Sequence, residues 1–167
     1  LMKPVIGITC GDPAGVGPEV IRGALSSGRL PESCTYRLLG ETAAFAPGQP
    51  TAESARHAWH TLEESVRLAT AGEIQAVVTA PIAKKAMHDV GFDFPGHTEF
   101  FAARTGTANF AMCLTGGRLT VALVTVHVAR KDVQGLWSEA EIVRVGRLLA
   151  EFLRRRGRSH PRIAVAG

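Results

Sequence analysis

Short apolar runs alternate with longer amphipathic segments along most of this 167-residue chain. The runs are rich in β-branched residues and several lack polar alternation, which is typical of strands that helices cover on both faces. Strands are predicted at residues 5–9, 36–40, 76–80, 110–116, 119–128 and 162–167. The pattern therefore predicts an α/β fold with a mostly parallel sheet flanked by helices. Gly116 and Gly117 are expected to join two of these strands as one antiparallel hairpin.

The ends of the longer helices can be read from proline, glycine and capping residues. Helices are predicted over residues 18–27, over 52–71, and from Ser138 to about residue 156. Pro18 suits a first helical turn, where its missing N–H costs nothing. Gly72 is expected to end the second helix. Ser138 and Glu141 have the spacing of a capping box for the third.

Composition narrows the classes of partner. The formal net charge of +4 stands beside 15 acidic residues, so it suits phosphorylated metabolites as well as nucleic acid. No aromatic residues interleave with the arginines of 154–158, which argues against a nucleic-acid platform. No apolar run is close in length to a membrane-spanning helix, which needs about 18 residues. Three scattered cysteines favour neither disulfides nor a zinc knuckle, and we expect a cytoplasmic protein with neither nucleic-acid nor membrane partners.

The turn "GDPAGVGPE", residues 11–19, follows the first predicted strand and leads into a helix. Glycines at such a position let backbone N–H groups at a helix N-terminus approach an anion. The spacing matches neither G-x-G-x-x-G nor G-x-x-x-x-G-K-[ST]. A ligand-binding turn and a purely structural turn are both compatible with these residues.

A second candidate stretch follows the strand 76–80. Pro81 is expected to open a helix with Lys84 in its first turn. A cation near a helix start is disfavoured by the helix dipole, so an anionic partner would explain Lys84. The alternative is that Lys84 and Lys85, the "KK" of this stretch, are an exposed, solvated pair.

His97 and Thr98 begin a further predicted helix, after a glycine that leaves the backbone room. An imidazole, a hydroxyl and free N–H groups together suit a phosphorylated or hydroxylated substrate. Taken alone, His97 is equally an ordinary loop histidine.

His127 is expected at the carboxyl end of the long strand 119–128, where a neutral imidazole could bind a divalent metal. Catalytic metal sites commonly use about three protein ligands, so partners would have to come from elsewhere. His57 and His60 lie off the apolar stripe of their helix and are predicted to be solvated.

Four ordered motifs, "ITCGDPAGVGPE", "VTAPIAKKA", "FPGHTEFFA" and "VTVHVARKDV", resemble the 4-hydroxythreonine-4-phosphate dehydrogenase family of vitamin B6 (pyridoxal phosphate) biosynthesis. The resemblance implies an isocitrate/isopropylmalate dehydrogenase-like fold and a cytoplasmic homodimer. It implies oxidation, with decarboxylation, of the small substrate 4-phosphohydroxy-L-threonine. The implied cofactors are NAD (or NADP) and a divalent metal, Zn, Mg or Co.

The same resemblance assigns roles residue by residue. His97 and Thr98 match the substrate-binding pair, and His127 matches the first of three metal-binding histidines. Lys84 matches the lysine of the family's T-A-P-I-N-K stretch and is the candidate catalytic residue, whereas Ala83 replaces the usual asparagine. Cofactor-binding residues are not assigned.

Residues 2–167 correspond to a single α/β region, the N-terminal part of a longer dehydrogenase. Family members continue into two further metal histidines, phosphate-binding residues and most of the cofactor site, so this chain is expected to be incomplete. The stretch between 36–40 and 46–50 is expected to be shorter than in the family. Two alternatives stay open: a paralogue acting on threonate or erythronate 4-phosphate, and a non-catalytic binding or dimerisation module.

Overall fold

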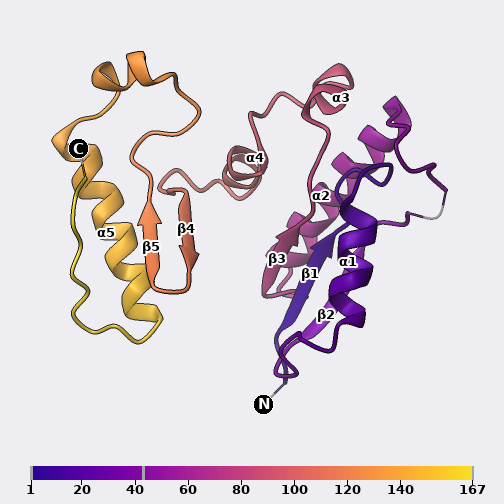
Figure 1. Ribbon diagram of the computed structural model, residues 1–167, viewed down its shortest axis with the longest axis horizontal. Coiled ribbons are helices and arrows are strands. Elements are labelled where there is room, and N and C mark those ends of the chain that lie inside the picture. Colours follow the sequence, from indigo (N-terminus) through magenta and orange to yellow (C-terminus); the bar gives the residue numbers. More distant parts are fainter. Residues whose placement is uncertain (1, 43, 167) are drawn as a thin grey trace. The chain divides into compact units, whose positions relative to one another are not determined.

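The computed structural model describes residues 2–42 and 44–166, and Gly167, the last residue of the predicted strand 162–167, lies outside them. The chain forms two compact units, Leu1–Gly106 and Thr107–Gly167, called the first and the second unit below (Figure 1). None of the helices in the described ranges is long and apolar enough to cross a membrane.

The first unit contains a parallel sheet with the strand order β2-β1-β3. Its elements are β1 (Val5–Thr9), α1 (Gly17–Ser26), β2 (Thr35–Leu39), α2 (Ala52–Thr70), β3 (Ala76–Thr79), α3 (Lys84–Asp89) and α4 (His97–Arg104). Ile8 in the central strand pairs with Leu38 on one side and Val78 on the other. The predicted α/β fold with a parallel sheet and flanking helices is confirmed.

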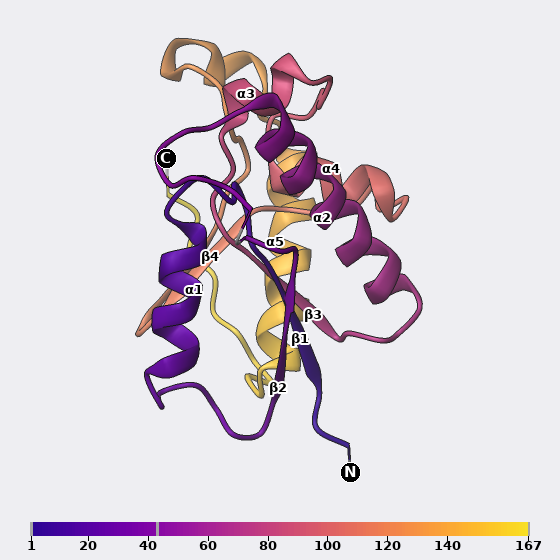
Figure 2. The same ribbon diagram turned by 90° about the vertical axis from the view of Figure 1, so that its right-hand side faces the viewer.

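Helices α1 and α2 cover opposite faces of this sheet, as Figure 2 shows. Ile21 of α1 packs with Ile8 on one face, and Leu68 of α2 packs with Leu39 on the other. Because β1 is central, the connection through α1 leads to one side of it and the connection through α2 to the other. The order in which strands are added to the sheet therefore reverses between β1 and β3. In open α/β sheets, ligands bind outside the carboxyl ends of the two strands at such a point.

Helix α2 ends before Gly72 as predicted, and its N-terminus has a capping box that was not predicted. Thr51 caps its N-terminus in a capping box with Ser54, each side chain accepting a hydrogen bond from the other residue's backbone N–H. Gly72 follows the C-terminus with a φ of +74°, a conformation that glycine adopts without steric cost.

Helices α3 and α4 are attached to α2 by an apolar cluster. Met87, Phe92 and Phe100 are almost fully buried and pack with Leu62 of α2. The rings of Phe92 and Phe100 lie 5.5 Å apart between their centroids. This cluster fixes the positions of the segments that carry Lys84 and His97.

The second unit contains an antiparallel hairpin and a long amphipathic helix. Its elements are β4 (Cys113–Gly116), β5 (Leu119–Ala122), the short 3-10 helix η1 (Arg130–Gly135) and α5 (Glu139–Arg155). Leu114 pairs with Val121, which confirms the predicted hairpin as a sheet of two strands. The Ser138 hydroxyl accepts a hydrogen bond from the Glu141 backbone N–H at 3.2 Å. This bond is one of the two that the predicted capping box would contain.

Two strand predictions in the second unit are wrong. Strand β5 ends at Ala122, and after the bond from Leu123 N to Met112 O the ladder does not continue to residue 128. His127 has a φ of 58°, which is incompatible with an extended strand. Residues 162–166 form no strand either, because they pair with neither strand of the hairpin.

Candidate functional site

Direct backbone contact closes the crevice between the carboxyl ends of β1 and β3. The backbone N–H of Asp12 donates to the carbonyl oxygen of Pro81 at 2.9 Å. Gly11 has a φ of +67°, and a Cβ built there would lie 2.3 Å from the same oxygen. A Cβ at Gly17 would lie 2.4 Å from the Cys10 carbonyl oxygen. Close packing thus explains these two glycines of the turn.

The polar groups of the same turn stabilise its own conformation. Asp12 is only 6% exposed, and its Oδ1 accepts a hydrogen bond from Ala14 N at 3.0 Å. The carbonyl oxygen of Ala14 in turn accepts from Gly48 N at 2.8 Å. The contacts favour the structural interpretation of residues 11–19, so groups available to a ligand must be sought beside the turn.

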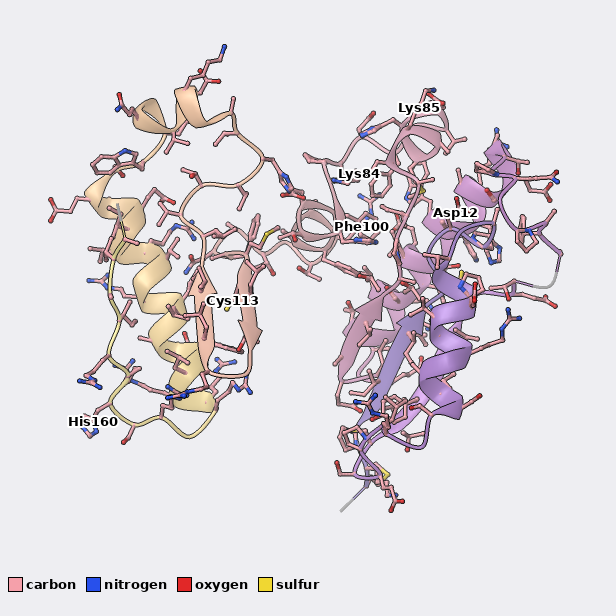
Figure 3. The ribbon with its side chains drawn as sticks, in the orientation of Figure 1. Asp12, Lys84, Lys85, Phe100, Cys113 and His160 are labelled. Atoms are coloured by element: carbon pink, nitrogen blue, oxygen red, sulfur yellow. The ribbon has the colours of Figure 1, made fainter. Side chains whose placement is uncertain are left out.

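The two lysines after β3 differ in their surroundings. Lys85 forms an exposed ion pair with Asp89 at 2.7 Å. Lys84 has no ion pair within the described part of the chain, and its Nζ lies 3.9 Å from where a Cβ on Gly96 would be. Figure 3 labels Lys84 in the region where α3 and α4 approach each other, with Lys85 farther out. The solvated interpretation of "KK" therefore suits Lys85, whereas Lys84 reaches the start of α4.

Helix α4 presents an open N-terminus to Lys84. Gly96 is its N-cap residue, in extended conformation and with no side-chain cap. The first backbone bond of the helix runs from Phe100 N to Gly96 O, so the preceding N–H groups lie outside the helical ladder.

Pro81 does not open α3 as predicted. That helix begins at Lys84, and its N-cap residue, Ala83, makes no side-chain capping bond.

His97 is the first residue of α4 and is partly buried. Its Nε2 is shielded from solvent and has no hydrogen-bond partner among the described residues. Burial lowers the pKa of His97 from its ordinary value of 6.5, and the positive charge of Lys84 lowers it further. The imidazole is therefore neutral at neutral pH. With the half-buried Thr98 beside it, the site combines an ammonium group, N–H groups outside the helical ladder, a hydroxyl and a neutral imidazole.

His127 does not lie at the end of a strand, contrary to the prediction. It belongs to the loop that follows β5 in the second unit. Within the described ranges, no three His, Cys, Asp or Glu residues form a group that could hold a metal ion. His97 and His127 belong to different units. The family resemblance implies that both serve one site, and this stays a prediction.

The prediction that His57 is solvated is wrong. Its ring packs against Phe45, with centroids 5.2 Å apart, and its Nε2 is shielded from solvent. Phe45 lies in the loop after β2, a segment whose fold the helical pattern of α2 does not predict. His60, by contrast, is exposed as expected.

Sequence reasoning also missed two relationships at this edge of the sheet. These are the contact of Gly11 with Pro81 and the approach of Lys84 to Gly96. The glycines themselves were a signal of close packing, but their partners lie about 70 and 12 residues away in the chain, beyond the reach of local patterns.

A three-stranded parallel sheet between two helices defines an α/β protein, and the donor groups beside the carboxyl ends of its strands lie where such proteins commonly bind ligands. Comparison with known proteins is more specific. The sequence profile of the family described as "Pyridoxal phosphate biosynthetic protein PdxA" matches residues 24–167, and the chain belongs to this family.

Relatives with assigned names cover nearly all of the chain. It is 38% identical to a 4-hydroxythreonine-4-phosphate dehydrogenase of Desulfosudis oleivorans, over 99% of this chain and 61% of the relative. It is 34% identical to a D-threonate 4-phosphate dehydrogenase of Salmonella typhimurium, over 97% of this chain and 62% of the relative. The chain thus spans about three-fifths of the length of these relatives. The first alignment extends over 209 positions, so this relative has residues with no counterpart among the 167 here.

A solved structure supports the same relationship. The crystal structure of 4-hydroxythreonine-4-phosphate dehydrogenase from Klebsiella pneumoniae superimposes with a TM-score of 0.79 at 29% identity, over 98% of this chain and 63% of that one.

Proposed function

We propose that residues 2–167 are the N-terminal part of a dehydrogenase that oxidises a small phosphorylated hydroxy acid, with 4-phosphohydroxy-L-threonine as the substrate. The observation that carries this proposal is the juxtaposition of Lys84 with the open N-terminus of α4, in a chain whose relatives are named for phosphorylated substrates. An ammonium group beside the first N–H groups of a helix suits an anion.

Each residue has a binding role in this proposal. Lys84 and the N–H groups of α4 hold a negatively charged group of the substrate, and this charge stabilisation is the catalytic contribution of Lys84. His97 and Thr98 bind uncharged oxygen atoms beside it. A phosphate held away from the reacting carbon fixes the substrate's orientation, which lowers the entropic part of the barrier.

The cofactors are proposed from the family resemblance. A nicotinamide cofactor, NAD or NADP, would accept the hydride released on oxidation of the hydroxyl. For the divalent metal, the described residues supply His127 as one candidate ligand but do not form a complete site. Homodimerisation and a cytoplasmic location are likewise proposals that rest on the resemblance.

A second substrate has support of its own. The relative from Salmonella typhimurium is named for D-threonate 4-phosphate, which also combines a phosphate with hydroxyl groups. Lys84, His97 and Thr98 suit both substrates, so these residues do not separate the two activities. A non-catalytic binding module is the third possibility.

The proposal is tested with the protein encoded by the complete reading frame. NADH formation is followed with 4-phosphohydroxy-L-threonine and with D-threonate 4-phosphate, and binding of each is measured by calorimetry. We expect turnover of one of them, and weaker binding in Lys84→Met and Thr98→Val. Lys85→Met is the matched control, because Lys85 is paired with Asp89 and should leave binding unchanged.

Two results would overturn the proposal: no binding of either compound, or equal binding by Lys84→Met and the unmodified protein. Binding without NADH formation would favour the non-catalytic module. We further expect the 167-residue chain alone to reduce no NAD, because the described residues lack a complete metal site.

A further inference from the structure

The start of α4 places charged groups close to a partly buried imidazole. The Nζ of Lys84 lies 3.9 Å, and the Oε2 of Glu99 lies 3.4 Å, from the position of a Cβ on Gly96. Lys84 reaches this point from α3, whereas Glu99 belongs to the first turn of α4. His97 follows Gly96 directly, and of these two charged groups Lys84 is the one that acts on the pKa of His97.

The solvation of His97 favours the uncharged ring. Its Nε2 is shielded from water and finds no hydrogen-bond partner in the described part of the chain. A charged imidazole in such a place would lose hydration without gaining an acceptor. A nearby ammonium group adds repulsion that acts in the same direction, and the lowered pKa of His97 has these two causes.

We propose that Lys84 is a positioning residue for His97: its ammonium group, close to the start of α4, adds to the effect of burial in keeping the imidazole uncharged, so that His97 meets the substrate as a neutral hydrogen-bonding group. Lys84 then has two tasks at one helix end. It attracts the anionic group of the substrate, and together with burial it opposes a second positive charge on His97.

The inference deepens the proposed function and rests on it for the nature of the substrate. A neutral imidazole offers one donor and one acceptor, which suits a hydroxyl group. An imidazolium offers two donors and a positive charge, which suits a second anion. The site is thereby selective for a substrate that presents a single anionic group to Lys84 and a hydroxyl to His97.

The test is an NMR titration of the His97 imidazole in the intact chain, in the absence of substrate. His97→Gln identifies the His97 signals among the six histidines by their loss. We expect Lys84→Met to raise the titration midpoint of His97 and Lys84→Arg to preserve it. Lys85→Met is the matched control, since it removes an adjacent charge that is paired with Asp89, and it should leave the midpoint unchanged.

A second measurement needs no variant. Added salt screens the exposed ammonium of Lys84 and should raise the midpoint of His97 in the unmodified chain, but much less in Lys84→Met. The inference is overturned if Lys84→Met leaves the midpoint unchanged, or if Lys85→Met shifts it equally. Failure of the proposed function would instead appear as absent substrate binding with the Lys84-dependent shift intact, so the two failures are distinguishable.

Discussion

Gly11 lies directly against the carbonyl oxygen of Pro81, and this contact joins the turn after β1 to the segment after β3. The neighbouring bond from Asp12 N to the same oxygen, 2.9 Å long, strengthens the junction. Both segments lead toward the candidate site, so their mutual contact fixes the backbone that precedes Lys84.

We expect Gly11→Ala to destabilise the first unit by about 2–5 kcal/mol. A left-handed backbone costs a non-glycine residue about 1–2 kcal/mol, and overpacking against backbone adds about 1–3 kcal/mol. Chemical denaturation measures the change. Gly28→Ala is the matched control, because Gly28 has nearly the same φ, +66°, but no atom within 4 Å of its Cβ position. Equal losses in the two variants would show that the contact with Pro81 contributes nothing.

Thr9, at the end of β1, is expected to be a site where a conservative substitution increases stability. Its side chain is fully buried, and Oγ1 has no hydrogen-bond partner among the described residues. An unsatisfied buried hydroxyl costs about 1–3 kcal/mol, so Thr9→Val should stabilise the protein by about 1 kcal/mol. Thr9→Ser keeps the hydroxyl, loses a methyl group and should destabilise. Destabilisation by Thr9→Val would indicate that the hydroxyl has a partner such as a buried water molecule.

Glu63 is expected to make stability depend on pH on the acid side. Hydrogen bonds from Arg104 lower the pKa of its carboxyl group from the ordinary value of 4.5, with a further contribution from Trp59. Because the folded-state pKa is the lower one, the unfolded chain binds the proton first. The stabilisation is therefore complete above the unfolded-state pKa and is lost as pH falls through the folded-state value.

Glu63→Gln should accordingly lower stability at neutral pH and make its loss below about pH 4.5 less steep. Denaturant unfolding at several pH values measures both effects. The control is Glu53→Gln, an exposed residue of the same helix without an ion pair in the described part of the chain. A slope as steep in Glu63→Gln as in the unmodified protein would contradict the assignment.

The proposed activity requires His97 and His127 to converge on one site, although they belong to different units. Spin labels at these two positions, in a background in which Cys34 and Cys113 are replaced by serine, allow the distance to be measured in the protein of the complete reading frame. We expect one short distance. A long or very broad distribution would show that the two histidines do not share a site, and would remove His127 from the proposed metal centre.

His127→Ala should weaken binding of a divalent metal and abolish oxidation in the same full-length protein. His160→Ala is a suitable control, because His160 is an exposed histidine outside the family motifs. Metal binding is measured by equilibrium dialysis, separately from activity. Unchanged affinity for the metal would exclude His127 as a ligand.

Much of the first unit follows from local patterns. The strands 5–9 and 76–79 and the helix 52–70 lie within two residues of their predicted bounds. β-Branched runs, helical periodicity, capping residues and glycine act over a few residues, so a single sequence reveals them. The four motifs also indicated the family that the profile of residues 24–167 confirms.

Long-range contacts decided the rest. The strand expected to reach residue 128 ends at Ala122, and residues 162–166 remain unpaired, because a strand needs a hydrogen-bonded neighbour as well as apolar residues. His57 is half-buried because a loop residue, Phe45, packs on it.

The sequence by itself therefore determined the α/β class, most helix and strand positions and the residue types available for chemistry, since these depend on short-range preferences. Only the tertiary structure decided that Gly11 closes on Pro81 and that Lys84, rather than Lys85, reaches the residue before His97. Those contacts join segments that are separate in the chain. Gly11 meets Pro81 because β1 and β3 are paired, and Lys84 meets Gly96 because α3 and α4 pack in one apolar cluster on α2; no local preference encodes either arrangement.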